Sequence, residues 1–134
     1  MFKDLLEELK KLNLPKGKFA IFGSGPMWPA GLKEPGDLDV IVTEDIFDDF
    51  RQKPEFKLGT EKGNYEYLER DGMEFCKNWY PGEEWGIEKL INEAEIINDL
   101  PFVKLEKVLK WKKIHNREKD QKDIELIEEY LNKK

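Results

Sequence analysis

Two aspartates in the run DLDVIVT, residues 37–43, could do chemistry together because a single residue separates them. Successive side chains of a β-strand point to opposite faces, so Asp37 and Asp39 would share one face while Leu38 and Val40 occupy the other. Two carboxylates this close repel each other, and divalent metal ions bound between them would neutralise that repulsion. A pair of such ions can also clamp phosphate oxygens. The alternative is an edge strand with both acids in water, although the apolar residues that follow fit an edge less well.

A glycine-rich turn, Gly23-Ser24-Gly25, follows the apolar run FAIF. Gly23 allows a ligand to approach the backbone closely, Ser24 adds a hydroxyl, and a short helix beginning at Pro26 would offer N–H groups to a phosphate. The turn lacks the Gly-Lys-Ser/Thr ending of a P-loop and the third glycine of a dinucleotide-binding fingerprint. We therefore expect either a phosphate-binding turn or simply a tight turn between two strands.

A third carboxylate would complete a metal site, and Glu74 is the candidate. In the run MEFC, Glu74 alternates with the apolar residues Met73 and Phe75, so a strand would place it on the opposite face from them. Glutamate on the exposed face of an amphipathic strand is common, which leaves a plain surface residue as the alternative. What favours a functional role is the pair of aspartates that it would join.

The elements that must position these residues follow from the spacing of apolar side chains. The dipeptide Asp71-Gly72 between two alternating segments predicts a β-hairpin. The order of elements predicts an α+β fold, a small mixed β-sheet with helices packed against it. We expect a single domain over residues 1–134, with a core at about 17–80 and a helical C-terminal part at about 86–132. Helices are expected at 3–12, from Thr43 to Phe50, at 87–97, 103–115 and 118–132, and strands at 19–22, 38–42, 56–58 and on both sides of the hairpin turn.

Composition limits the partners. The chain has 134 residues, a net charge of −6 and 39% charged residues, which suits a small soluble domain. Only the run KWKKIHNREK is locally basic, so long nucleic acid is disfavoured as a substrate, whereas a small phosphate-bearing ligand is compatible. No run approaches the ~18 apolar residues of a membrane span, the N-terminal run is too charged for a signal peptide, and the single Cys76 cannot form an internal disulfide. We therefore expect a cytoplasmic protein without membrane contact.

These motifs together resemble the nucleotidyltransferase superfamily, the fold shared by DNA polymerase β and the small, minimal nucleotidyltransferases. The family pattern is a strand followed by Gly-Ser, a loop and helix, Asp-x-Asp on the next strand and a third acid on a later strand. This chain has FGSG…GDLDVIV…MEF in the same order, and the resemblance covers roughly residues 17–131. It implies that Gly23 and Ser24 form the phosphate-binding turn and that Asp37, Asp39 and Glu74 are the catalytic, metal-binding carboxylates.

The C-terminal run WKKIHNREKDQKDIELIEEYL resembles the helical tail of small family members, in which a basic residue before Lys-Asp faces the nucleotide. This resemblance implies nucleotide-binding roles for Lys112, Lys119 and Asp120. From the residues alone, Lys112 continues the apolar stripe of its helix. It would either extend along its methylenes to solvent or border a phosphate pocket.

The resemblance implies an enzyme that requires Mg²⁺ or Mn²⁺ and binds a nucleoside triphosphate, with ATP as the first candidate. It would move the nucleotidyl group to a hydroxyl of a small molecule or protein that the sequence does not identify. One alternative is a non-catalytic, antitoxin-like module of the same fold that acts through a separate helical protein partner. Another is a scaffold that has lost its chemistry, although the three intact acids argue mildly against it.

Overall fold

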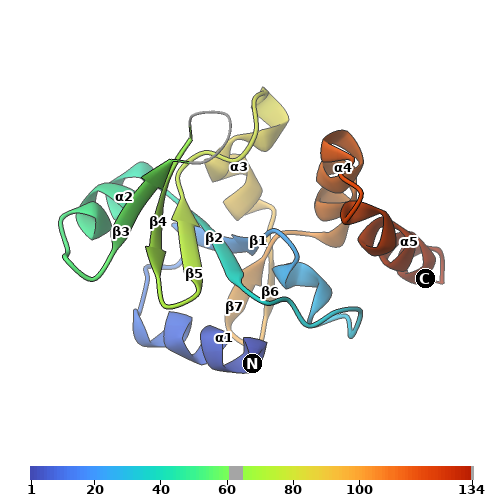
Figure 1. Cartoon of the computed structure of the whole chain (residues 1–134), viewed down its shortest axis with the longest axis horizontal. Coiled ribbons are helices and arrows are strands. Elements are labelled where there is room, and N and C mark those ends of the chain that lie inside the picture. The colour runs from blue at the N-terminus through green and yellow to red at the C-terminus, as the bar shows by residue number, and fades with distance from the viewer. Residues whose placement is uncertain (61–64, 134) are drawn as a thin grey trace.

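The computed structural model describes residues 1–60 and 65–133, which form helices on both faces of an open, mixed β-sheet (Figure 1). The predicted α+β class and the predicted mixed sheet are confirmed. The helices are α1 (Phe2–Lys11), α2 (Glu44–Arg51), α3 (Ile87–Asn92), α4 (Leu105–His115) and α5 (Asp120–Asn132), with short 3-10 helices η1 (Gly25–Met27) and η2 (Glu83–Trp85). The strands are β1 (Phe19–Phe22), β2 (Leu38–Val42), β3 (Lys57–Thr60), β4 (Glu66–Arg70), β5 (Met73–Cys76), β6 (Glu95–Ile97) and β7 (Leu100–Phe102).

The sheet has seven strands in the order β3-β4-β5-β2-β1-β7-β6. Strand β2 lies between β1, to which it is antiparallel, and β5, to which it is parallel. Strand β1 also pairs in parallel with β7, and the outer pairs β3–β4, β4–β5 and β6–β7 are antiparallel. The candidate residues therefore lie on three adjacent strands at the centre of the sheet. The glycine turn follows β1, the aspartate pair lies at the start of β2, and Glu74 lies in β5.

Two apolar clusters cover the two faces of the sheet. On one face, Val40 and Phe75 are buried together with Leu6 of α1 and Phe47 of α2. On the other face, residues of β1 and β2 pack against helices that come later in the chain; this cluster includes Ala20, Phe22, Ile41, Leu90, Val108 and Ile127. Helices α4 and α5 contact each other and lie side by side at one end of the molecule (Figure 1). The two clusters explain why β1 is apolar at every position and β2 at every position except Asp39, since both faces of these central strands are covered.

One predicted helix is partly wrong. The helix expected at 87–97 ends at Asn92, and the chain then forms the antiparallel hairpin β6–β7. Asn98 and Asp99 connect the two strands with positive φ angles of 52° and 68°, which suit a tight hairpin turn. Pairing of β6 with β7, which joins the sheet through β1, overrides the helical spacing at the end of residues 87–97.

Smaller differences also have structural reasons. The helix expected from residue 103 begins at Leu105, because the Val103 N–H donates to the Ile21 carbonyl at 2.9 Å and so belongs to the sheet. The helix expected at Pro26 is the single 3-10 turn η1, with proline in its first turn as predicted. Within residues 1–60 and 65–133, no helix has both the length and the apolar character to cross a membrane.

Candidate active site

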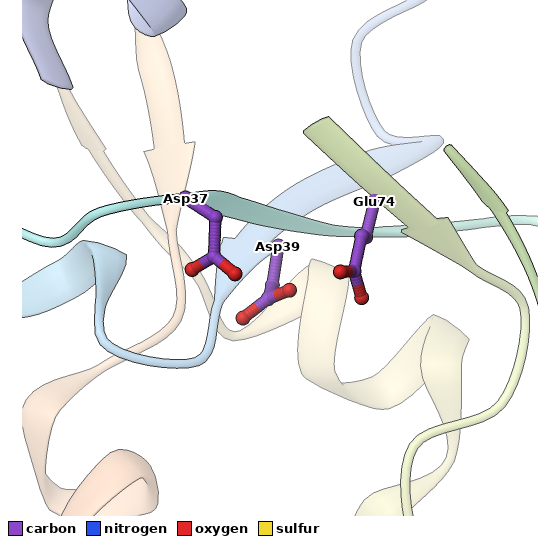
Figure 2. Close-up of side chains that lie close together, drawn as sticks. All are labelled: Asp37, Asp39 and Glu74. Carbon is purple, nitrogen blue, oxygen red and sulfur yellow. The ribbon is translucent and has the colours of Figure 1, made fainter. Parts of the chain in front are cut away.

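Three carboxylates gather on one side of the central strands. Asp37 lies immediately before β2, Asp39 lies within β2, and Glu74 lies within β5. One carboxylate oxygen of each residue lies within 4.8 Å of the others, and Figure 2 shows the three side chains projecting from the same side of the strands. The predicted convergence of Asp37, Asp39 and Glu74 is confirmed. Asp37 is exposed and the other two are half-buried, so the cluster lies at the edge of the protein interior.

The register between β2 and β5 explains this convergence. Parallel pairing places Asp39 opposite Glu74 and Val40 opposite Phe75. Burial of Val40 and Phe75 in the core on one face forces the two acids onto the other face, because side chains alternate along a strand. A one-residue slip would place the acids in the apolar cluster that holds Val40 and Phe75, so burial of these two side chains fixes the position of the acids.

The glycine turn lies next to this acid cluster. Phe22, the last residue of β1, pairs with Asp39, and Gly23 follows with a φ of 66°. A β-carbon built at position 23 would lie 2.3 Å from Oδ2 of Asp39, so only glycine fits beside the carboxylate in this arrangement. Gly23 and Asp39 are therefore direct neighbours in the fold, and a joint role in one functional site stays a prediction.

Ser24 begins a turn in which some of the backbone N–H groups already donate hydrogen bonds to carbonyls of the same turn. The N–H groups of Met27 and Trp28 donate to the carbonyls of Ser24 and Gly25, each at 3.0 Å. The single turn of η1 is much shorter than an α-helix, so the phosphate-binding helix expected after the turn is reduced to this one turn. The Ser24 hydroxyl accepts a hydrogen bond from Nζ of Lys112 at 3.1 Å.

Lys112 does not extend to solvent, so that alternative of the sequence analysis is wrong. Its side chain is 2% exposed, and its ammonium group lies 3.1 Å from a carboxylate oxygen of Asp123 and 3.7 Å from one of Asp120. Both aspartates are also buried, at 1% and 5% side-chain exposure. The lysine is therefore held between the turn and the first residues of α5, which brings Lys112, Asp120 and Ser24 together.

Each of the two buried aspartates has a second cationic partner. Arg117 donates to both carboxylate oxygens of Asp120, at 2.9 and 3.0 Å, and its backbone N–H donates to the same residue at 3.1 Å. Lys33 donates to Asp123 at 2.9 Å. Lys33, Lys112, Arg117, Asp120 and Asp123 form what we call the buried ion-pair network. Burial raises the pKa of Asp120, but the hydrogen bonds and charge of Arg117 outweigh it and hold this pKa below its ordinary value of 3.8.

Lys33 and Asp123 are members of the network that were not predicted as site residues. A signal for Asp123 was present, since Asp120 and Asp123 lie at the helical spacing of the apolar Ile124 and Ile127 and so share the buried face of α5. No comparable signal identifies Lys33, which lies in the loop before β2 and 90 residues from Asp123. Lys119 is exposed at the start of α5, and the described contacts do not connect it to the network, so its nucleotide-binding role stays a prediction.

An aromatic cluster packs beneath the turn. Phe22 stacks on Trp79 with ring centroids 4.3 Å apart, and Trp111 lies 5.0 Å from Trp79. Trp85 is buried in the same cluster. The indole N–H of Trp79 is the one buried side-chain polar atom in the described part of the chain without a hydrogen-bond partner. These tryptophans pack as core residues that support β1 and the start of the turn.

A hollow of about 470 Å³ lies elsewhere in the molecule. It is lined by residues of α1, by Phe19 and by residues of β7, and none of the three acids is among its lining residues. Phe19 is at the opposite end of β1 from Gly23. The acid cluster is therefore distinct from this hollow.

Comparisons with protein-family models, with curated proteins and with solved structures found no match to this chain.

Proposed function

We propose that this protein is a metal-dependent nucleotidyltransferase that moves a nucleoside monophosphate from a nucleoside triphosphate, ATP first, to a hydroxyl of a small molecule or protein. The observation that supports the proposal most directly is the position of Gly23 beside Asp39, within a cluster of three carboxylates. A turn that accommodates phosphates and acids that hold divalent cations are the two parts that such a reaction requires. The resemblance of the motifs to the nucleotidyltransferase superfamily supports the same reaction.

The three acids fit Mg²⁺ or Mn²⁺, which prefer oxygen ligands. Oxygens on opposite sides of one Mg²⁺ are about 4.2 Å apart, since each bond is about 2.1 Å. The carboxylate oxygens of this cluster lie within 4.8 Å of one another, so small side-chain movements would bring them to one ion. Asp37 and Asp39 would hold both ions of a pair, and Glu74 would hold one of them. The bound metal would supply positive charge that offsets the carboxylates and the triphosphate.

The residues of the chain would have the following roles. The Ser24 hydroxyl and nearby backbone N–H groups would bind the β- and γ-phosphates. Asp39 or Glu74 would accept the proton of the attacking hydroxyl as its oxygen bonds to the α-phosphorus. The bond from that phosphorus to the β-phosphate would break, and pyrophosphate would leave. The acids and the turn would together align the attacking and leaving oxygens, which is the main protein contribution to phosphoryl-group chemistry.

Transfer of label tests the proposal. The protein is incubated with Mn²⁺ and ATP labelled at the α-phosphate, together with a cell extract that supplies hydroxyl-bearing small molecules and proteins. We expect a labelled adduct with the parent protein and more than a hundredfold less with Asp39→Asn. Glu69→Gln is the control, because Glu69 lies opposite Glu74 on β4 but is outside the acid cluster.

Binding and transfer separate the proposed enzyme from its alternative. If the parent protein binds neither Mn²⁺ nor Mn²⁺–ATP in calorimetry, the proposal is wrong. If it binds both but transfers no label, a non-catalytic module of the same fold becomes the better explanation.

A further inference from the structure

A single buried lysine connects the glycine turn to the helical end of the chain. Lys112 of α4 donates to Ser24 across a separation of 88 residues in the sequence. Its ammonium group also lies 3.1 Å from Asp123 and 3.7 Å from Asp120, both near the start of α5. The turn, α4 and α5 thus meet at one charged atom.

We propose that Lys112 is a positioning residue that fixes the conformation of the turn at Ser24, and that its charge is committed to protein groups and not to a nucleotide phosphate. The inference deepens the proposed function, on which it rests only for the role of the turn in nucleotide binding. It assigns the pair α4–α5 a part in shaping the site.

Lys112 has one hydrogen-bond partner and two carboxylates within ion-pair distance. A lysine ammonium group has three N–H bonds and no acceptor. Here it makes one hydrogen bond to Ser24 and faces two carboxylates, while its side chain is only 2% exposed. No part of the side chain is left to snorkel outward, in contrast with surface lysines that cover apolar residues with their methylenes.

Both carboxylates are also held by a second cationic side chain. Arg117 holds Asp120 through two side-chain hydrogen bonds, and Lys33 holds Asp123. Movement of Lys112 toward a phosphate would leave each of these two buried carboxylates with one cationic partner in place of two, and breaking buried ion pairs is destabilising. The buried ion-pair network therefore favours the lysine where it is, beside Ser24.

The hydrogen bond from Lys112 would limit the conformational freedom of the glycine turn. Ser24 lies between two glycines, which lose more backbone freedom on folding than other residues. Its hydroxyl is the group that receives the Lys112 hydrogen bond, while the backbone of the turn is closed by the Met27 and Trp28 N–H groups. Loss of the lysine should increase local opening of these backbone hydrogen bonds.

Hydrogen exchange on the nucleotide-free protein tests the inference. In Lys112→Met we expect the Met27 and Trp28 amides to exchange about tenfold faster, the effect of one lost hydrogen bond to a charged group. The Phe47 amide, which donates to Thr43 on the other face of the sheet, serves as the internal reference for any change in global stability. Lys113→Met is the matched control, since Lys113 is the adjacent residue of α4 but is half-exposed and pairs with Glu128.

A second variant covers the case in which Lys112→Met does not fold. Lys112→Met combined with Asp123→Asn removes the cation together with a carboxylate that it would leave behind, and Asp123→Asn alone is its reference. We expect the Met27 and Trp28 amides to exchange faster in the double variant than in the single one. Equal exchange in the two would overturn the inference.

The two proposals fail in different ways. Unchanged turn exchange in Lys112→Met, with weakened binding of Mn²⁺–ATP, would show that the lysine contacts the nucleotide directly and would overturn the positioning role. If the parent protein does not bind Mn²⁺–ATP, the proposed function fails, yet the exchange result still decides whether Lys112 fixes the turn.

Discussion

Gly23 and Asp39 are so close that a β-carbon at position 23 would lie 2.3 Å from Oδ2 of the aspartate. The nearest atom is the end of a side chain, so in Gly23→Ala the Asp39 carboxylate must leave its present position in the cluster. We expect Gly23→Ala to weaken Mn²⁺ binding at least tenfold in calorimetric titrations. Alanine with a positive φ also costs about 1–2 kcal/mol of unfolding free energy.

Gly31→Ala separates these two effects. Gly31 has a φ of 76°, similar to that of Gly23, but a β-carbon there meets no atom within 4 Å. It should therefore show the same backbone cost in urea unfolding and keep the Mn²⁺ affinity of the parent. Equal loss of Mn²⁺ affinity in both variants would mean that backbone strain, and not the contact with Asp39, governs the site.

The acid cluster predicts a specific pattern of metal stabilisation. A ligand that binds only the folded state raises the melting temperature by mass action, so Mn²⁺ at a hundredfold excess over its dissociation constant should contribute about 2.7 kcal/mol. We expect this stabilisation in the parent and its loss in Asp37→Asn, Asp39→Asn and Glu74→Gln. Thermal unfolding with and without Mn²⁺ measures it.

Glu69→Gln should retain the Mn²⁺ stabilisation. Glu69 pairs with Glu74 across β4 and β5, so it has the same residue type and the same face of the sheet without belonging to the cluster. Loss of stabilisation in this control but not in Glu74→Gln would assign the third ligand to Glu69.

The sequence predicted β1, β2 and the placement of the acids because these depend on local alternation. Leu38 and Val40 are apolar and buried, and the strand period of two then places Asp37 and Asp39 together. Glu74 required one further step, the hairpin at Asp71-Gly72, whose residues adopt positive φ angles. Where the local alternation of side chains matches their burial in the sheet, the sequence alone predicts the strands and the positions of the acids.

The parts that the sequence did not predict depend on distant residues. Residues 87–97 satisfy helical spacing, but Glu95–Ile97 forms a strand because it pairs with β7, which itself pairs with β1. Similarly, the spacing of Lys112 fits a snorkelling lysine and a buried one equally well. Its burial depends on Ser24 of the glycine turn and on Asp120 and Asp123 of α5, which the fold brings to α4 from two distant segments.

The turn of the β6–β7 hairpin gives a test of this unexpected element. Asp99 has a φ of 68°, which glycine adopts freely and a β-branched residue adopts at a cost of about 1–2 kcal/mol. We expect urea unfolding to show a stability near or slightly above that of the parent for Asp99→Gly and a clear loss for Asp99→Val. Equal stability of the two variants would be inconsistent with a left-handed residue at this position.

The buried ion-pair network predicts a pH dependence of stability. Although burial alone raises the pKa of Asp120, Arg117 holds it below 3.8 in the folded protein. A carboxyl group whose pKa is lowered by folding contributes stability that is fully present above its unfolded pKa. That contribution is lost as the pH falls through the folded pKa, because the folded state must then bind the proton that the unfolded state already holds.

Asp120→Asn should therefore differ most from the parent at neutral pH and least in acid. At pH 7 we expect a loss of about 1–3 kcal/mol, since the hydrogen bonds of Asp120 to a charged partner are weakened in the interior. Urea unfolding at pH 7, 5, 4 and 3 should show this difference shrinking below about pH 4, near the ordinary pKa of an aspartate. Asp48→Asn, a change of an exposed acid on α2, is the control and should lie close to the parent across the series. A difference between Asp120→Asn and the parent that stays constant down to pH 3 would mean that Asp120 stabilises the fold by packing and not through its charge.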